Sequence, residues 1–298
     1  MTVDTNALLI ILTGSLIAIS CGFLGVFLLL RKMSMTGDAI SHAVLPGIVI
    51  GFFVSGSQRS LEVILGAGLL GILSTLMIDA LRKKAKVQLD ASIGITFTLL
   101  FAIGIILINL FAYKVDLDQE CVLYGEIAYL PIDLWITPSG LNMGPRITWL
   151  AVLNFFLVTG FIYLLFKELS LTSFDENFSS SIGIPAKGVN LALMSMVSYT
   201  TVSSFESVGA ILVVALLVVP PSTAYLWTKS LIPLLRLTAA LGILIAILGY
   251  YLAFWIDSSI AGMMVAVAGA FFFGSALIKG KWPQLLRETS PSPESLLS

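Results

Sequence analysis

Long apolar runs alternate with short polar breaks along almost the whole chain. A helix that crosses the hydrocarbon core of a bilayer needs about 20 predominantly apolar residues. Nine stretches meet or approach this length: 6–30, 38–55, 61–81, 91–113, 147–166, 188–204, 208–228, 231–255 and 258–279. The stretch 188–204 is the most polar, because it holds seven Ser, Thr and Tyr residues. The pattern predicts an all-α, polytopic membrane protein with about eight or nine transmembrane helices.

Composition supports this interpretation and excludes two broad classes of protein. Hydrophobic residues make up 58% of the 298 residues, and charged residues only 11%. Soluble domains carry about 25% charged residues, so a soluble enzyme is excluded. The net charge of −1 offers no basic face to nucleic acid, and we expect no nucleic-acid partner. We predict one transmembrane domain over 1–280 and a disordered cytoplasmic tail over 281–298.

The basic residues predict how the chain is oriented in the membrane. Twelve Lys and Arg residues lie in the breaks after the first, third, fifth, seventh and ninth stretches, or in the tail, and three lie in the opposite breaks. Basic residues stay on the cytoplasmic side. We therefore expect an outer N-terminus and a cytoplasmic C-terminus. The first basic residue is Arg31, so 6–30 lacks the basic start of a signal peptide and is interpreted as a membrane span.

Two residues with metal-binding side chains lie inside the second apolar stretch. Asp38 lies seven residues beyond Arg31, roughly 10 Å deeper along a helix. Asp38 and His42, the only histidine, are four residues apart and therefore share one helix face. Ionisable side chains inside a membrane are costly and indicate function by default. One hard oxygen and one borderline nitrogen suit Mn(II), Fe(II) or Zn(II), and do not suit Cu(I).

The sequence leaves three interpretations of this pair open. A neutral histidine paired with the aspartate could simply tie two helices together, although Ser or Thr would do so at lower cost. Alternatively, the pair could ligate a metal with a third ligand from the same chain. In the third interpretation a symmetric dimer supplies two Asp and two His ligands, which suffices for four-coordination.

A short amphipathic segment comes after the fifth apolar stretch. Ser173 and Glu176 have the spacing of a capping box, with Asp175 in the first turn. Three apolar residues recur at a spacing of four and share one face: Phe174, Phe178 and Ile182. Gly183 would end the helix. A helix of about nine residues is too short to span, so its apolar face would bind a partner groove or the lipid surface, unless the segment is an ordinary connector.

Four further residues are weaker candidates. Pro220, followed by a second proline, predicts a kink or an unwound turn late in its apolar stretch. Glu206, at the outer edge, is a candidate for gating or ion approach, or a surface carboxylate without a role. Cys121 is a possible soft ligand or a packed apolar residue. It lies with Glu126 in a long external segment, 113–135, that could be a docking loop or a re-entrant piece.

Three motifs resemble the permease subunits of the zinc/manganese/iron ABC importers. They are LRKMSMTGDAISHAVLPG, LTSFDENFSSSIGIP and SVGAILVVALLVVPPSTAYL, which occur in the family's order and spacing. The likeness runs from about residue 8 to 280, and DQECVLYGEIAYLP is most similar to the manganese- or iron-linked branch. No GxxxxGK[ST] segment occurs in the chain, so ATP would have to be bound by another subunit.

The resemblance implies a fold related to the vitamin B12 and siderophore importers and a location in the bacterial plasma (inner) membrane. It implies a second permease chain (the same chain or a paralogue), a dimer of ABC ATPase subunits and an extracytoplasmic metal-binding protein. The permease would pass a divalent metal ion and hold no tightly bound cofactor. Asp38 and His42 match the family's metal-site residues. The segment 174–184 matches the coupling helix that docks on the ATPase, including Phe174, Asp175, Glu176, Phe178, Ile182 and Gly183. The external insertion 136–146 departs from the shortest members and leaves the receptor-facing surface open.

Three other functions compete with this interpretation. An importer of metal chelates or siderophores has the same fold but would need no Asp38–His42 pair. An ion-coupled carrier would need acidic relays in several spans, whereas few charges besides Asp38 lie deep in this chain. An intramembrane metalloenzyme would need a base near the metal, and the single histidine has no nearby glutamate.

Overall fold

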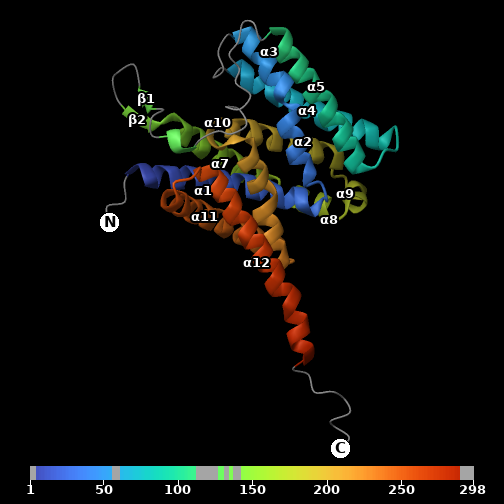
Figure 1. Ribbon diagram of the computed structural model, residues 1–298. Helices are drawn as coiled ribbons and strands as arrows, with labels where there is room; N and C mark the ends of the chain where they lie inside the picture. Colours follow the sequence, from blue (N-terminus) through green and yellow to red (C-terminus); the bar gives the residue numbers. More distant parts are fainter. Residues whose placement is uncertain (1–4, 56–60, 112–126, 131–133, 137–141, 289–298) are drawn as a thin grey trace, which may run out of the picture.

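The computed structural model describes residues 5–55, 61–111, 127–130, 134–136 and 142–288. These parts are almost entirely helical (Figure 1). The helices are α1 (Thr5–Leu30), α2 (Met35–Ala43), α3 (Leu45–Ser55), α4 (Leu61–Lys83), α5 (Leu89–Phe111), η2 (Ile127–Tyr129), α7 (Arg146–Leu164), α8 (Phe166–Phe174), α9 (Glu176–Ser181), α10 (Ala186–Trp227), α11 (Leu231–Ile256) and α12 (Ile260–Glu288). The strands β1 (Leu134–Ile136) and β2 (Asn142–Pro145) form an antiparallel hairpin.

Eight segments of the described chain are long and apolar enough to cross a membrane. They correspond to eight of the nine predicted stretches, with α2 and α3 together forming the second. The remaining stretch, 188–204, is helical and forms the first part of α10, but its Ser and Thr residues leave it too polar for this criterion. The prediction of an all-α membrane protein with about eight or nine spans is therefore confirmed.

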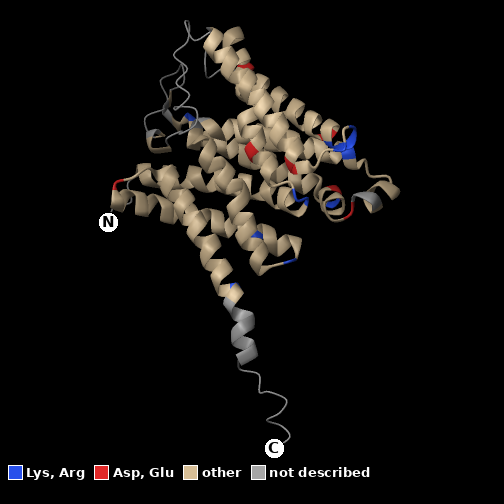
Figure 2. Ribbon diagram, turned by 45° about the vertical axis from the view of Figure 1, so that its right-hand side comes forward, with Lys and Arg blue, Asp and Glu red and all other residues tan. Residues whose placement is uncertain are grey.

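Large apolar side chains on the outer faces of these helices agree with a bilayer environment. Four leucines of α4 point outward along its length, and five aliphatic residues of α5 do the same: Leu65, Leu69, Leu73, Leu76, Ile95, Leu99, Ile103, Ile106 and Leu110. Charged residues are sparse on the ribbon, and Lys and Arg gather near the end of α4 and beside α8 and α9 (Figure 2). Exposed apolar surface of this extent is rare on soluble proteins and expected in lipid.

The helices form two groups joined by α10. In one group α1 crosses the molecule and contacts α7, α10 and α11, while α12 contacts α10 and α11 (Figure 1). The second group is α2 to α5, in which α3 contacts α4 and α5, and α2 contacts α5. The helix α10 also contacts α2 and α4. The main core lies around α1 and α10, where Leu24, Phe27 and Leu193 are fully buried.

A glycine allows the closest approach between α1 and α10. A Cβ atom on Gly25 would overlap the carbonyl oxygen of Leu217. That carbonyl lies four residues before Pro221, which has no N–H to donate to it. The carbonyl that the proline leaves unpaired therefore faces the Cα of Gly25, where a weak C–H···O contact is geometrically possible. Gly25 and Pro221 thus lie at the same helix contact.

Three features of the helices differ from the simple pattern of apolar stretches. The second stretch is interrupted at Val44, because Pro46 cannot donate to the carbonyl of His42 four residues earlier. In α10 the backbone breaks at Gly209, whose φ of 76° and ψ of 161° are non-helical, whereas Pro220 lies within helical backbone. The helix α12 extends to Glu288, so the first eight residues of the expected disordered tail, 281–288, are helical. Residues 289–298 lie outside the described part.

Candidate functional site

The pair Asp38 and His42 lies on α2, on the face turned away from the core. Asp38 is in the first turn, where the helix dipole favours a carboxylate, and His42 is in the last turn. The imidazole Nε2 and the carboxylate Oδ1 are 3.6 Å apart, which is too long for a hydrogen bond. On the opposite face, Ile40 is fully buried, and a Cβ on Gly37 would contact Leu217 of α10. The spacing of four therefore places both groups together, as predicted.

Two aromatic rings of α5 hold the imidazole from one side. The ring centroid of His42 lies 5.8 Å from that of Phe97 and 5.5 Å from that of Phe101. The two phenylalanines are themselves four residues apart and share one face of α5. The histidine is therefore oriented by apolar packing, and no pattern in the sequence indicates these partners.

The pair retains unused capacity to bind a ligand. The Asp38 side chain is 51% exposed and that of His42 32% exposed, in a segment whose length and composition suit a bilayer. In the described part of the chain, no cluster of three or more His, Cys, Asp and Glu residues could hold a metal ion. A third ligand from the same chain thus finds no support there. The exposed face leaves room for ligands from outside the chain.

The predicted amphipathic segment is helical, but its capping differs from the prediction. Ser173 is not an N-cap: it lies inside α8, and its hydroxyl donates to the carbonyl of Leu169. The N-cap of α9 is Asp175, whose carboxylate accepts the N–H of Phe178 at 2.9 Å. The predicted helix of about nine residues is therefore two short helices that meet at Asp175, with Phe174 ending α8. The side chain of Glu176 lies outside the described part.

The end of α9 agrees with the prediction at Gly183. The N–H of Ile184 donates to the carbonyl of Ser179 at 3.0 Å, and that of Gly183 to Ser180 at 3.2 Å. This pair of bonds is the Schellman motif, which requires a left-handed residue, and Gly183 has a φ of 87°. Three large side chains of the segment are at least half exposed: Phe174, Phe178 and Ile182. The segment thus presents uncovered apolar groups at a fixed helix end.

The structure gives less information on the other candidate residues. The backbone of Glu206 lies in α10, three residues before the break at Gly209, and its side chain lies outside the described part. Pro220 is buried beside the contact of α1 with α10. Cys121 and Glu126 also lie outside the described residues. Just after them, Ile127 and Leu130 are 1% and 0% exposed and belong to the main core, so this part of the external segment packs onto the bundle.

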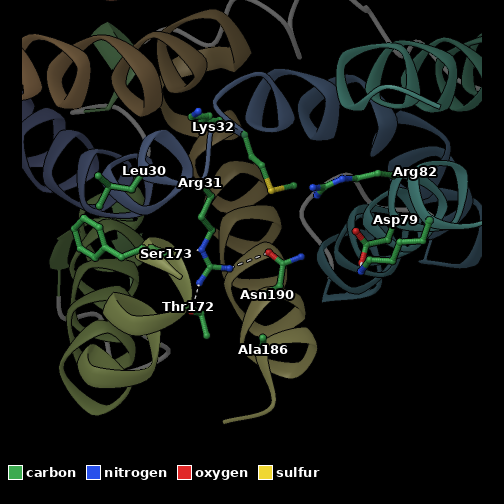
Figure 3. Close-up of a pocket in the computed structure, with 12 residues that line it drawn as sticks. Leu30, Arg31, Lys32, Asp79, Arg82, Thr172, Ser173, Ala186 and Asn190 are labelled. Atoms are coloured by element: carbon green, nitrogen blue, oxygen red, sulfur yellow. Dashed lines mark hydrogen bonds and ion pairs between the residues drawn. The ribbon is translucent and has the colours of Figure 1, made fainter. Parts of the chain in front are cut away.

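The sequence did not indicate a role for Arg31, which lies near α8 and α9, beyond marking a membrane surface. Arg31, at the end of α1, donates to Ser173 and Thr172 of α8 and to Asn190 of α10 (Figure 3). It lines a cavity of about 210 Å³ together with residues from α4, including Asp79 and Arg82. An arginine at the end of an apolar run gives no sequence signal for such partners.

Comparisons with known proteins agree with the fold and the motifs. Residues 5–279 match the model of the ABC 3 transport family. The manganese transport system membrane protein MntD of Bacillus subtilis is 44% identical over 272 residues, which cover 90% of this chain and 92% of that protein. The zinc transport system membrane protein TroD of Treponema pallidum is 39% identical, over 88% of this chain and 71% of that protein.

Solved structures show the same architecture. PsaBC from Streptococcus pneumoniae, in complex with Fab, matches with a TM-score of 0.74 at 30% identity, over 92% of this chain and 91% of that chain. An inward-facing ABC transporter of the metal-chelate type matches with a TM-score of 0.62 at 17% identity, over 91% of this chain and 85% of that chain, and supports the fold alone. The chain is therefore a multi-pass membrane protein that belongs to the ABC 3 transport family.

Proposed function

We propose that this chain is the permease subunit of an ABC importer that moves a divalent transition-metal ion, with Mn²⁺ favoured, into a bacterial cytoplasm. The observation that carries the proposal is the Asp38–His42 pair, which is exposed on a membrane-length segment and has unused ligand capacity. The relatives MntD and TroD, named for manganese and zinc transport, support the same class of cargo.

In this proposal the metal site is completed by a second permease chain. One chain supplies a carboxylate and an imidazole, and two chains related by a twofold axis supply two of each. Four oxygen and nitrogen ligands suit Mn²⁺, Fe²⁺ or Zn²⁺. The site must release its ion as well as accept it, and ligands held on exposed helix faces can separate when the two chains move apart.

The remaining parts of the importer would be separate subunits. ATP would be bound and hydrolysed by a pair of ATPase subunits, which dock on α8 and α9 through Phe174, Phe178 and Ile182. An extracytoplasmic metal-binding protein would deliver the ion from the opposite side. This arrangement places α9 in the cytoplasm, the N-terminus outside and the C-terminus inside, in keeping with the basic residues near the end of α4.

Metal uptake in cells that lack their own manganese and zinc importers tests the proposal. The chain is expressed with its neighbouring ATPase and binding-protein genes, as wild type, Asp38→Ala and His42→Ala. Asp90→Ala is the matched control, because it removes another exposed carboxylate from the first turn of a helix, α5. We expect uptake of Mn²⁺ that is lost in both site variants and retained in the control.

Two results would contradict the proposal in different ways. Uptake at the wild-type rate in Asp38→Ala and His42→Ala would remove the site assignment and leave the transporter. No metal uptake by the wild type, with the assembled complex present in the membrane, would favour a chelate as cargo.

A further inference from the structure

Arg31 joins three elements at one end of the bundle. Its Nε donates to the Ser173 hydroxyl at 3.0 Å, and its two terminal nitrogens donate to Thr172 at 2.7 Å and to the Asn190 side-chain oxygen at 2.9 Å. Ser173 and Thr172 belong to α8, and Asn190 to α10. Figure 3 shows the guanidinium pointing between these acceptors, beside the cavity. The side chain that directly follows α1 therefore holds α8 and the start of α10 together.

The backbone that carries Arg31 is itself held in a fixed turn. The N–H of Met33 donates to the carbonyl of Leu28 at 2.9 Å, and that of Lys32 to Leu29 at 3.0 Å. These are the bonds of a Schellman motif, and Lys32 takes its left-handed position with a φ of 58°. Met33 is 6% exposed and packs in the main core. The turn therefore fixes the backbone that joins Arg31 to the next helix, α2.

The helix α2 carries both Asp38 and His42. It begins at Met35, four residues after Arg31, and reaches Asp38 in its first turn. On the other side of the guanidinium, Thr172 and Ser173 lie in the last turn of α8, immediately before the cap of α9. The exposed α8–α9 segment is thus connected to the Asp38–His42 pair through the Arg31 side chain and the backbone turn that follows it.

Membrane orientation alone does not account for these contacts. A charge that only marks the cytoplasmic surface is best left in water, as the exposed Lys32 shows. The guanidinium of Arg31 is instead partly buried and bound to hydroxyl and amide oxygens. Its planar fork fixes the direction of several hydrogen bonds at once, which an ammonium group cannot do.

We propose that Arg31 is the positioning residue that transmits movement of α8 and α9 to α2, and so to the metal ligands. This inference rests on the function proposed above. The cavity of about 210 Å³ lies between this linked unit and the end of α4, where Asp79, Arg82 and Lys83 line it. At this end, the cavity leaves space between Arg31 and α4.

The test compares metal transport with ATP hydrolysis in the same preparation. The permease is purified with its ATPase subunits and reconstituted in liposomes, with the binding protein and Mn²⁺ supplied outside. The number of Mn²⁺ ions that enter per ATP hydrolysed is measured for wild type, Arg31→Gln, Arg31→Lys and Lys32→Gln. Lys32→Gln is the matched control, because it removes a neighbouring charge from the same cavity lining and keeps the left-handed backbone occupied by a comparable side chain.

We expect Arg31→Gln to lower the ratio of Mn²⁺ to ATP at least tenfold while the KM for Mn²⁺ stays within twofold of wild type. Arg31→Lys should restore part of the ratio, and Lys32→Gln should leave it unchanged. A merely structural role would lower both rates together, so a ratio within twofold of wild type in Arg31→Gln overturns the inference.

A second variant covers the case in which Arg31→Gln does not assemble. Thr172→Val combined with Ser173→Ala removes both acceptors on α8 and leaves Arg31 in place, and the same tenfold criterion applies. Asp38→Ala in the same liposomes separates the two proposals. If Mn²⁺ entry is absent in the wild type, the proposed function fails. If entry is insensitive to Asp38→Ala, the transporter remains but the site assignment fails. This inference fails in either case. If entry depends on Asp38 while both Arg31 tests leave the ratio unchanged, only the role of Arg31 is wrong.

Discussion

Arg31 lies seven residues before Asp38 and eleven before His42, yet the polar groups of Arg31 and of the Asp38–His42 pair are used in opposite ways. The Arg31 guanidinium donates to three side chains of its own chain at 2.7–3.0 Å. Asp38 and His42 approach only to 3.6 Å, and both remain partly exposed. A group whose hydrogen bonds are made within the fold holds that fold in one arrangement. A group with unused bonding capacity in a membrane segment is available to something outside the chain.

The difference has a direct energetic consequence. A buried donor that loses its acceptor costs roughly 1–3 kcal/mol, because the group stays desolvated and unpaired. Asp38 and His42 make no hydrogen bond to each other and are partly exposed, so removing either side chain leaves no buried donor without an acceptor. Substitutions around Arg31 should therefore affect how the chain is held together. Substitutions of the Asp38–His42 pair should affect cargo and leave the fold intact.

The largest predicted effect is on transport by Asp38→Ala. Outer-shell groups that only orient a ligand already change metal affinity by about 10–100-fold, so loss of a direct ligand should lower Mn²⁺ uptake at least that much. The thermal unfolding temperature of the purified complex should change by less than about 2 °C, since the carboxylate is 51% exposed. Uptake and unfolding are measured on the same preparations. A loss of uptake accompanied by a drop of many degrees would mean that the pair stabilises the fold, as the competing helix-tie interpretation holds.

Sequence patterns were sufficient for the spans, because length and hydropathy together define a membrane helix. They were also sufficient to place Asp38 and His42 on one face, since that placement is set by a spacing of four. Patterns failed where the decisive partner is distant in the chain. Phe97, Phe101 and the acceptors of Arg31 lie on other helices, and only the packing brings them together.

Local errors had local causes. Ser173 and Asp175 both have side chains that cap helices, and only the observed bond from Phe178 selects Asp175. In α10, two prolines predicted the break, but a proline can remain in a helix when a neighbouring element faces the carbonyl it leaves unpaired. Gly25 does so for Leu217, and the non-helical turn is at Gly209 instead.

Gly25→Ala tests whether the close contact of α1 with α10 stabilises the fold. A Cβ there would overlap the Leu217 carbonyl of α10, so we expect a destabilisation of about 1–3 kcal/mol and an unfolding temperature several degrees lower. Gly160→Ala in α7 is the control, because no atom outside its own helix lies within 4 Å of the added Cβ. The control should be neutral or slightly stabilising. Equal behaviour of the two variants would show that the close approach of α1 and α10 does not matter.

Asp175→Ala tests whether the N-cap of α9, in the exposed α8–α9 segment, matters for transport. Loss of an N-cap costs about 1 kcal/mol, which is large for a helix of six residues, Glu176–Ser181. We expect the ratio of Mn²⁺ entry to ATP hydrolysis in liposomes to fall by up to about fivefold, which is the population change that 1 kcal/mol produces. Asp175→Asn keeps a good cap and removes the charge, so it should restore the ratio. If Asn behaves like Ala, the carboxylate acts through its charge on a partner and not through the helix.

The smallest predicted effect is on the stability of the turn at Lys32, which lies between Arg31 and the Asp38–His42 pair. Lys32 has a φ of 58°, a conformation that costs a non-glycine residue about 1 kcal/mol and that glycine adopts freely. Lys32→Gly should therefore raise the unfolding temperature of the complex by about 1–3 °C. The hydrogen bonds of this turn are made by the backbone, so glycine should preserve them, and the ratio of Mn²⁺ to ATP should stay at the wild-type value. Higher stability with a lower ratio would mean that the stiffness of residue 32 itself is needed to carry movement from Arg31 to Asp38. In that case Lys32, together with Arg31, would be needed to couple α8 and α9 to α2.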